Sequence, residues 1–177
     1  MTWRIGTLGF GLLAAAGFAV PAHAAAEPLG EDRAACLNGG PAIEVNLTGW
    51  KDRAGEIKLE LYPGAQEDFL KDDRDLRKEG KFFRRVAVPV PPSGPVSLCI
   101  KAPHPGRFGL FVTHNRDGRN AFSIWQDGAG IASNRKIGRG KPRLEASTVE
   151  VPAGVAVLNI QLQYLRGLAF GPIRGKE

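Results

Sequence analysis

The chain of 177 residues has 24 basic and 18 acidic side chains, a formal net charge of +6, and a hydrophobic share of 43%. This length suits one domain with one sizeable core. The two cysteines form no C-x-x-C pair and the three histidines are scattered, which argues against a Cys/His metal cluster.

The N-terminus has the features of a cleaved signal peptide in their usual order. Arg4 precedes an apolar run at 5–20, and Pro21 then comes before the small-residue sequence Ala-His-Ala at 22–24. The run is shorter than the roughly 20 residues that a membrane-spanning helix needs. Residues 1–24 are therefore predicted to be a signal peptide. We expect a periplasmic or secreted protein with no membrane span after cleavage and no nucleic-acid partner.

The two cysteines predict a disulfide. Cys36 lies in a polar leader at 25–41, and Cys99 lies in an alternating segment of the main domain. An even cysteine count in an oxidising compartment favours pairing over two free buried thiols. Alternation points Cys99 outward, so the bridge is expected to pin the leader over an outer sheet face or edge, which would limit edge-to-edge aggregation.

Apolar and polar residues alternate with period two in seven segments, which predicts seven strands. These segments lie within 43–47, 57–61, 86–90, 96–100, 108–114, 149–151 and 156–164. Turn-forming residues separate them, and no helical crossover pattern intervenes. We predict an all-β fold, an antiparallel seven-stranded β-sandwich over 42–170, followed by a disordered tail at 171–177. One short helical excursion is expected at 65–78 and one long loop at 115–142.

The long loop begins with a turn that has some features of a cation site. Asn115, Asp117 and Asp127 would supply oxygen ligands for a hard cation such as calcium. Arg119 occupies the next alternate position, and its positive charge disfavours tight cation binding. A turn in which Asp and Asn side chains cap their own backbone is therefore favoured, with a weak calcium site as the alternative.

No catalytic constellation is present in the sequence. There is no G-x-S-x-G motif, and neither cysteine has a neighbouring histidine. His114 has inward parity at the end of its strand, where a hydrogen-bonded histidine at the core edge is expected. Trp50 and Trp125 either plug the open end of the core, which is favoured, or form a stacking surface for sugars or peptides. We expect no enzymatic activity and no cofactor.

Several motifs in order resemble the bacterial family called domain of unknown function 2141. They include V-N-L-T-G at 45–49, P-G-R-F-G-L-F-V at 105–112 and a Ser-Asn pair at 133–134. The resemblance covers roughly 36–169 and implies an exported sandwich similar to transthyretin-like (prealbumin-like) modules, with no assigned activity. The chain departs from the pattern at Asn115, where the family usually has Asp.

These features together predict a non-enzymatic ligand-binding or envelope interaction module. The candidate ligand-binding residues are His114, Asp117, Trp125, Asp127 and Trp50. Basic side chains gather at 81–85 and 135–143, which favours ordinary solvated faces, and contact with a cell-envelope glycan or an anionic surface is the alternative. The alternative is a metal-dependent enzyme or cation-binding protein that uses the loop at 114–127.

Overall fold

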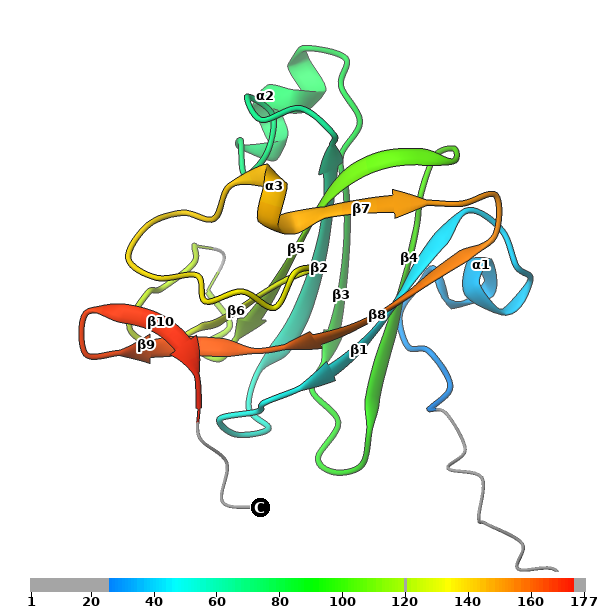
Figure 1. Ribbon diagram of the computed structural model, residues 1–177. Helices are drawn as coiled ribbons and strands as arrows, with labels where there is room; N and C mark the ends of the chain where they lie inside the picture. Colours follow the sequence, from blue (N-terminus) through cyan, green and yellow to red (C-terminus); the bar gives the residue numbers. More distant parts are fainter. Residues whose placement is uncertain (1–25, 120, 174–177) are drawn as a thin grey trace, which may run out of the picture.

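The computed structural model describes residues 26–119 and 121–173, so the predicted signal peptide lies outside the described residues. Within these residues ten strands form two sheets, accompanied by three short helices (Figure 1). The strands are β1 (Ala42–Thr48), β2 (Glu56–Pro63), β3 (Arg84–Pro89), β4 (Val96–Lys101), β5 (Gly106–Asn115), β6 (Gly128–Ile131), β7 (Thr148–Val151), β8 (Val155–Gln161), β9 (Gln163–Arg166) and β10 (Ala169–Pro172). The helices are α1 (Arg33–Leu37), α2 (Asp73–Lys78) and α3 (Leu144–Ser147). None of the helices in the described part is long and apolar enough to cross a membrane.

The smaller sheet has the order β4-β1-β8, and the larger sheet runs β10-β9-β6-β5-β2-β3, with β7 also paired to β5. The predicted all-β fold is thus confirmed. One pairing corrects the expectation of a purely antiparallel sandwich, because β1 and β8 run parallel. The chain passes through the larger sheet between these two strands, so no hairpin imposes an antiparallel direction on them.

The main core lies between the two sheets and follows the predicted alternation. In β1 the apolar residues are buried while Glu44 and Asn46 are only partly covered, and β2 repeats this pattern. Both sheets contribute fully buried side chains, among them Ile43, Leu59 and Val112. Packing of two inner faces in this way provides the apolar burial that stabilises a domain of this size.

A second apolar cluster covers the outer face of the larger sheet. It contains Tyr62, Phe69, Leu76, Phe111, Ala129, Ile131, Leu144 and Phe170. Leu76 comes from α2, which occupies only the last part of the helical excursion predicted at 65–78. The Asp72 carboxylate caps this helix by accepting the Arg74 backbone N–H at 2.9 Å. Because of this cluster, β5 is buried on both faces from Phe108 onward.

The structure has ten strands where seven are predicted, and there are physical reasons why the sequence pattern does not predict the other three. Strand β6 lies inside the predicted long loop and lacks alternation because two of its four residues are glycine. A Cβ atom at Gly128 would lie 2.5 Å from the Tyr164 ring, and one at Gly130 would lie 2.7 Å from Ile160. The last predicted strand is divided into β8 and β9. Strand β10 continues two residues into the predicted tail, of which 174–177 lie outside the described residues.

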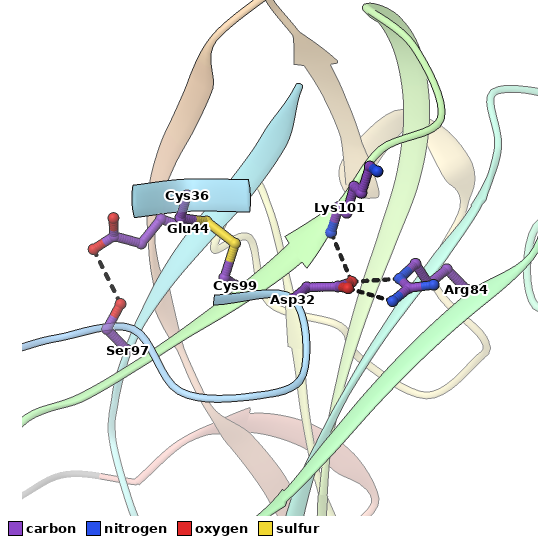
Figure 2. Close-up of a disulfide and its surroundings, with 7 residues drawn as sticks. All are labelled: Asp32, Cys36, Glu44, Arg84, Ser97, Cys99 and Lys101. Atoms are coloured by element: carbon purple, nitrogen blue, oxygen red, sulfur yellow. Dashed lines mark hydrogen bonds and ion pairs between the residues drawn. A yellow bond between two sulfur atoms is a disulfide. The ribbon is translucent and has the colours of Figure 1, made fainter. Parts of the chain in front are cut away.

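The N-terminal leader covers the free edge of β4 (Figure 2). Cys36 and Cys99 form the predicted disulfide. The Leu29 N–H donates to the Ser97 carbonyl oxygen at 2.8 Å, and the Cys99 N–H donates to the Leu29 carbonyl oxygen at 3.1 Å. Cys99 has the outward parity expected of it, yet it is fully buried because the leader lies over it. The leader thereby occupies hydrogen-bonding groups that an edge strand otherwise exposes.

A buried carboxylate adds a second attachment between the leader and the sheets. Asp32 is 6% exposed and accepts hydrogen bonds from the Arg84 guanidinium and from the Lys101 backbone N–H, the latter at 2.9 Å (Figure 2). Arg84 belongs to β3 and Lys101 to β4, so this one side chain joins strands of both sheets. The leader is therefore an integral part of the domain.

Candidate ligand-binding site

His114 lies at the end of β5 and is fully buried. Its Nε2 is 2.8 Å from the carbonyl oxygen of Ala54, and because that oxygen only accepts, Nε2 carries the ring hydrogen. Nδ1 then accepts the hydroxyl hydrogen of Tyr164 at 2.8 Å. Burial lowers the pKa of His114 below its ordinary value and raises the pKa of Tyr164 to about 12. The imidazole is thus neutral and held by protein groups on both sides.

Trp50 closes the end of the core next to this histidine. Its ring packs edge-on against His114 with centroids 5.2 Å apart, and its Nε1 donates to the Leu47 carbonyl oxygen at 3.3 Å. The Arg53 guanidinium carbon lies 4.7 Å from the centroid of the same ring. Trp50 is partly buried and contacts the main core, so the plug interpretation fits this tryptophan.

Asp127 organises the polypeptide around the loop and is 1% exposed. Its carboxylate accepts the backbone N–H groups of Arg116 at 2.9 Å and Ser123 at 2.8 Å. The Arg116 side chain forms an ion pair with Asp52 and also donates to the Gln126 carbonyl oxygen at 2.7 Å. Hydrogen bonding from Arg116 holds the pKa of Asp52 below its usual range. Both carboxylates are therefore committed to holding the loop.

Asp117 forms the predicted self-capped turn by accepting the Arg119 backbone N–H at 2.9 Å. Asn115 donates from its amide to Glu56 at 2.9 Å and to the Arg119 carbonyl oxygen at 3.0 Å. The described residues contain no group of three or more His, Cys, Asp or Glu side chains placed to hold a metal ion. Two buried oxygens, Asn115 Oδ1 and Asp117 Oδ2, have no hydrogen-bond partner within the described ranges.

Trp125 lies apart from these residues and projects into solvent, 74% exposed. It lines a shallow pocket of about 200 Å³ together with Ile124 and Leu168, which are 49% and 76% exposed. Phe122 is also exposed and packs against Phe170, which lines the same pocket. We call Phe122, Ile124, Trp125 and Leu168 the apolar patch. The plug interpretation is wrong for Trp125.

A run of exposed cations lies beside the apolar patch. This basic segment, residues 135–143, exposes five basic side chains, namely Arg135, Lys136, Arg139, Lys141 and Arg143. Arg139 lines the pocket of the patch, and the other four line a neighbouring pocket of about 250 Å³. Arg135 pairs with Glu145 at 3.7 Å. Within the described ranges the remaining four cations form no ion pair with an acidic side chain.

The five predicted ligand-binding residues do not converge on one pocket. His114 contacts Trp50, and Asp127 and Asp117 are occupied in the loop backbone, whereas Trp125 lines the pocket of about 200 Å³ with none of the other four. Sequence reasoning missed Leu168, which occupies the turn between β9 and β10. The signal for it is a large apolar residue directly after Gly167, at a turn position where polar residues are usual.

Comparison with known proteins identifies one relationship. A family model described as "Uncharacterized protein conserved in bacteria (DUF2141)" matches residues 45–158, which agrees with the resemblance found in the motifs. Searches of curated proteins and of solved structures returned no match. Because the matched region covers well over half of the chain, the protein belongs to the DUF2141 family.

Proposed function

We propose that this protein is an exported, non-enzymatic binding module of the bacterial cell envelope, and that it binds through the apolar patch and the basic segment. One observation carries the proposal. Four of the seven large hydrophobic side chains exposed in the described residues gather in the patch, directly beside Arg139. Contiguous exposed apolar surface with a polar rim is typical of interaction sites.

The contacts of the polar residues near the loop support a structural role for these residues. Both ring nitrogens of His114 and both carboxylate oxygens of Asp127 are engaged by protein groups. A general base must reach the proton that it abstracts, and these groups are buried and engaged by the protein. The patch with its cations is, by contrast, exposed to a ligand.

The proposed location is the periplasm or the exterior of the cell. It rests on the signal-like residues 1–24 and on the Cys36–Cys99 disulfide, a bond that persists in oxidising compartments. Intact-mass measurement of protein from an osmotic-shock extract tests it. A mature chain starting at Ala25 with no free thiol is expected, and an unprocessed chain confined to the cytosol would contradict it.

Sedimentation with isolated envelope tests the binding function. Mature protein is mixed with crude envelope that contains both membrane and cell-wall sacculi, and the pelleted fraction is measured. The double variant Trp125→Ser/Leu168→Ser is expected to stay in the supernatant. Leu37→Ser is the matched control, because Leu37 is 56% exposed on α1, on the opposite side of the molecule from β9 and β10 (Figure 1). Equal pelleting of wild type and the double variant would contradict the proposal.

The finer fold assignment is also a proposal. We infer a transthyretin-like (prealbumin-like) sandwich. Its seven framework strands are β1 to β5, β7 and β8, and β6, β9 and β10 are additions to this framework. The two-sheet arrangement and the chain order support it. An experimental structure compared with such modules tests it, and a different order among the seven strands would contradict it.

Cation binding is the second candidate function. The observation that favours it is the pair of buried oxygens, Asn115 Oδ1 and Asp117 Oδ2, that have no hydrogen-bond partner in the described ranges, although Arg119 lies 3.7 Å from the latter. Equilibrium dialysis against calcium tests this candidate, with Asp117→Asn as the variant and the exposed Asp75→Asn as the control. Binding that only Asp117→Asn abolishes would establish it, and no binding by wild type would remove both the cation-binding protein and the metal-dependent enzyme.

A further inference from the structure

The tips of two separate loops form the apolar patch. Ile124 and Trp125 come from the loop after β5, and Leu168 comes from the turn between β9 and β10. Each tip brings a large apolar side chain into solvent at a place where the backbone reverses direction. Their meeting in one pocket, rather than scattered exposure, is the feature that requires an explanation.

The scaffold holds both tips firmly. In the loop, the Ser123 carbonyl oxygen accepts the Asp127 N–H at 2.9 Å, and the Asp127 carboxylate accepts the Ser123 N–H at 2.8 Å. In the hairpin, Phe170 and Gly138 exchange two backbone hydrogen bonds, of 2.7 and 3.2 Å. The patch is thus preorganised, and binding does not have to order it first.

The Gln163 side chain holds the backbone of the basic segment beside the patch. Gln163 of β9 accepts the Ile137 N–H at 2.9 Å and donates to the Arg135 carbonyl oxygen at 2.8 Å. The aliphatic stem of Lys136 lies over Gly171 of β10, where an added Cβ atom would be 3.4 Å from Lys136 Cε. From 128 to 173 the chain has six basic and only two acidic side chains. Within the basic segment itself there are five basic and no acidic side chains.

The chemistry of the pocket distinguishes between possible envelope ligands. Its lining consists of Ile124, Trp125, Gly138, Arg139, Leu165, Gly167, Leu168 and Phe170. A glycan site needs side-chain acceptors and amides that match sugar hydroxyls, and this lining contains one charged group and no carboxylate or amide side chain. A tryptophan with aliphatic neighbours and a rim of cations instead matches the boundary between acyl chains and anionic headgroups.

The geometry points to an anionic phospholipid bilayer as the partner of this surface. Trp125, Ile124 and Leu168 insert at the headgroup boundary, and the basic segment lies against the lipid phosphates. Charge complementarity favours a bilayer over an apolar groove of another protein, because four cations of the segment have no acidic partner in the described part of the chain. This inference rests on the proposed binding function and specifies its ligand class.

Vesicle sedimentation of the mature protein tests the inference. One set of vesicles contains phosphatidylglycerol and phosphatidylethanolamine at about one to three, and the other contains phosphatidylcholine alone. We expect pelleting with the anionic set only, and loss of pelleting at about 1 M salt, where charges are screened within a few ångströms. Purified lipid-free sacculi are the parallel sample.

Two variants separate the apolar and the charged contributions. Trp125→Ser/Leu168→Ser is expected to abolish partitioning, and both side chains are mostly exposed, so the fold is expected to persist. Lys136→Gln/Arg139→Gln is expected to weaken partitioning about 25-fold, at about fivefold for each charge. Its matched control is Arg77→Gln/Lys78→Gln, which removes two charges that pair with acids on the distant α2.

The outcomes are distinguishable. Anionic-vesicle binding that the apolar-patch variant and the basic-segment variant both weaken and the α2 control preserves would establish the inference. Equal binding to both vesicle types, or equal weakening by the α2 control, would overturn it. Pelleting with sacculi but not with vesicles would overturn the inference and leave the proposed binding function standing. Pelleting with neither would overturn both.

Discussion

Tyr164 donates its hydroxyl hydrogen to Nδ1 of His114 across 2.8 Å, and the two side chains meet over Gly128. Gly128 is paired with His114 on one side and with Tyr164 on the other, so this residue of β6 lies between them in the sheet. The Tyr164 oxygen also accepts the Lys51 N–H at 3.2 Å. This buried network joins β5 and β9, with β6 between them, to the loop between β1 and β2.

Removal of the tyrosine hydroxyl tests the network. In Tyr164→Phe, Nδ1 of His114 and the Lys51 N–H lose their partner inside the protein. We expect the free energy of unfolding to fall by about 1–3 kcal/mol, the usual cost of an unsatisfied buried group. Urea unfolding followed by circular dichroism measures it. The exposed histidine provides a control in His104→Gln, which is expected to change stability by less than about 0.5 kcal/mol; a loss as large as that of Tyr164→Phe would contradict the account.

The buried histidine predicts a pH dependence of stability. Burial lowers the pKa of His114 in the folded protein, so the unfolded chain binds more protons once the pH falls below about 6.5. The contribution is fully present above that pH and is lost as the pH falls toward the folded-state pKa, at up to about 1.4 kcal/mol per pH unit. Asp52, Arg116 and Asp127 are the charged groups that act on this ring.

Comparison of wild type with His114→Gln measures this contribution. Unfolding free energies from about pH 8 to pH 5 are expected to fall more steeply for wild type, and the two curves should converge as the pH decreases. Parallel curves across that range would show that His114 is not buried as a neutral ring.

Gly128 tests the close approach of Tyr164. A methyl group in Gly128→Ala would lie 2.5 Å from the Tyr164 ring, so the ring must move away from His114. We expect a loss of about 1–3 kcal/mol from overpacking. Gly140→Ala is the matched control, since nothing lies within 4 Å of its added Cβ atom and its backbone has no positive φ. Wild-type stability in Gly128→Ala would contradict the arrangement of β6 and β9.

The disulfide predicts the largest stability effect. The bridge between Cys36 and Cys99 spans a sequence separation of 63, for which chain entropy gives about 4 kcal/mol. Cys36→Ser/Cys99→Ser is expected to lose most of this amount and to aggregate on storage, because release of the leader uncovers the edge of β4. Asp32→Asn provides a comparison that weakens the Arg84 attachment and retains the bridge. If the double cysteine variant scatters as little light after storage as wild type does, the leader does not protect the edge of β4.

The period-two alternation and the even number of cysteines predict much of the fold. Strands such as β1 and β2 were predictable because one face packs and the other meets water. Strand β6 was not, because Gly128 and Gly130 leave room for Tyr164 and Ile160, which lie 36 and 30 positions further along the chain. The burial of Cys99 was equally hidden, since it depends on a leader that has no strand pattern.

The candidate site was predictable only in part. Trp125 was identified as one of two loop tryptophans, and its exposure depends on a loop conformation that Asp127 fixes from the far end. Leu168 belongs to the apolar patch only because a hairpin turn brings it beside Trp125. Sequence patterns indicate what packs inside a strand, and they do not show which loop tips meet.

Fluorescence of Trp125 tests the central claim most directly. A chain that starts at Ala25, the proposed mature form, contains two tryptophans, so Trp50→Phe leaves Trp125 as its single tryptophan. On addition of isolated envelope at a concentration that pellets the protein, we predict that its emission shifts to shorter wavelength and becomes protected from acrylamide quenching. Emission and quenching unchanged while the protein still pellets would show that the envelope binds some other face.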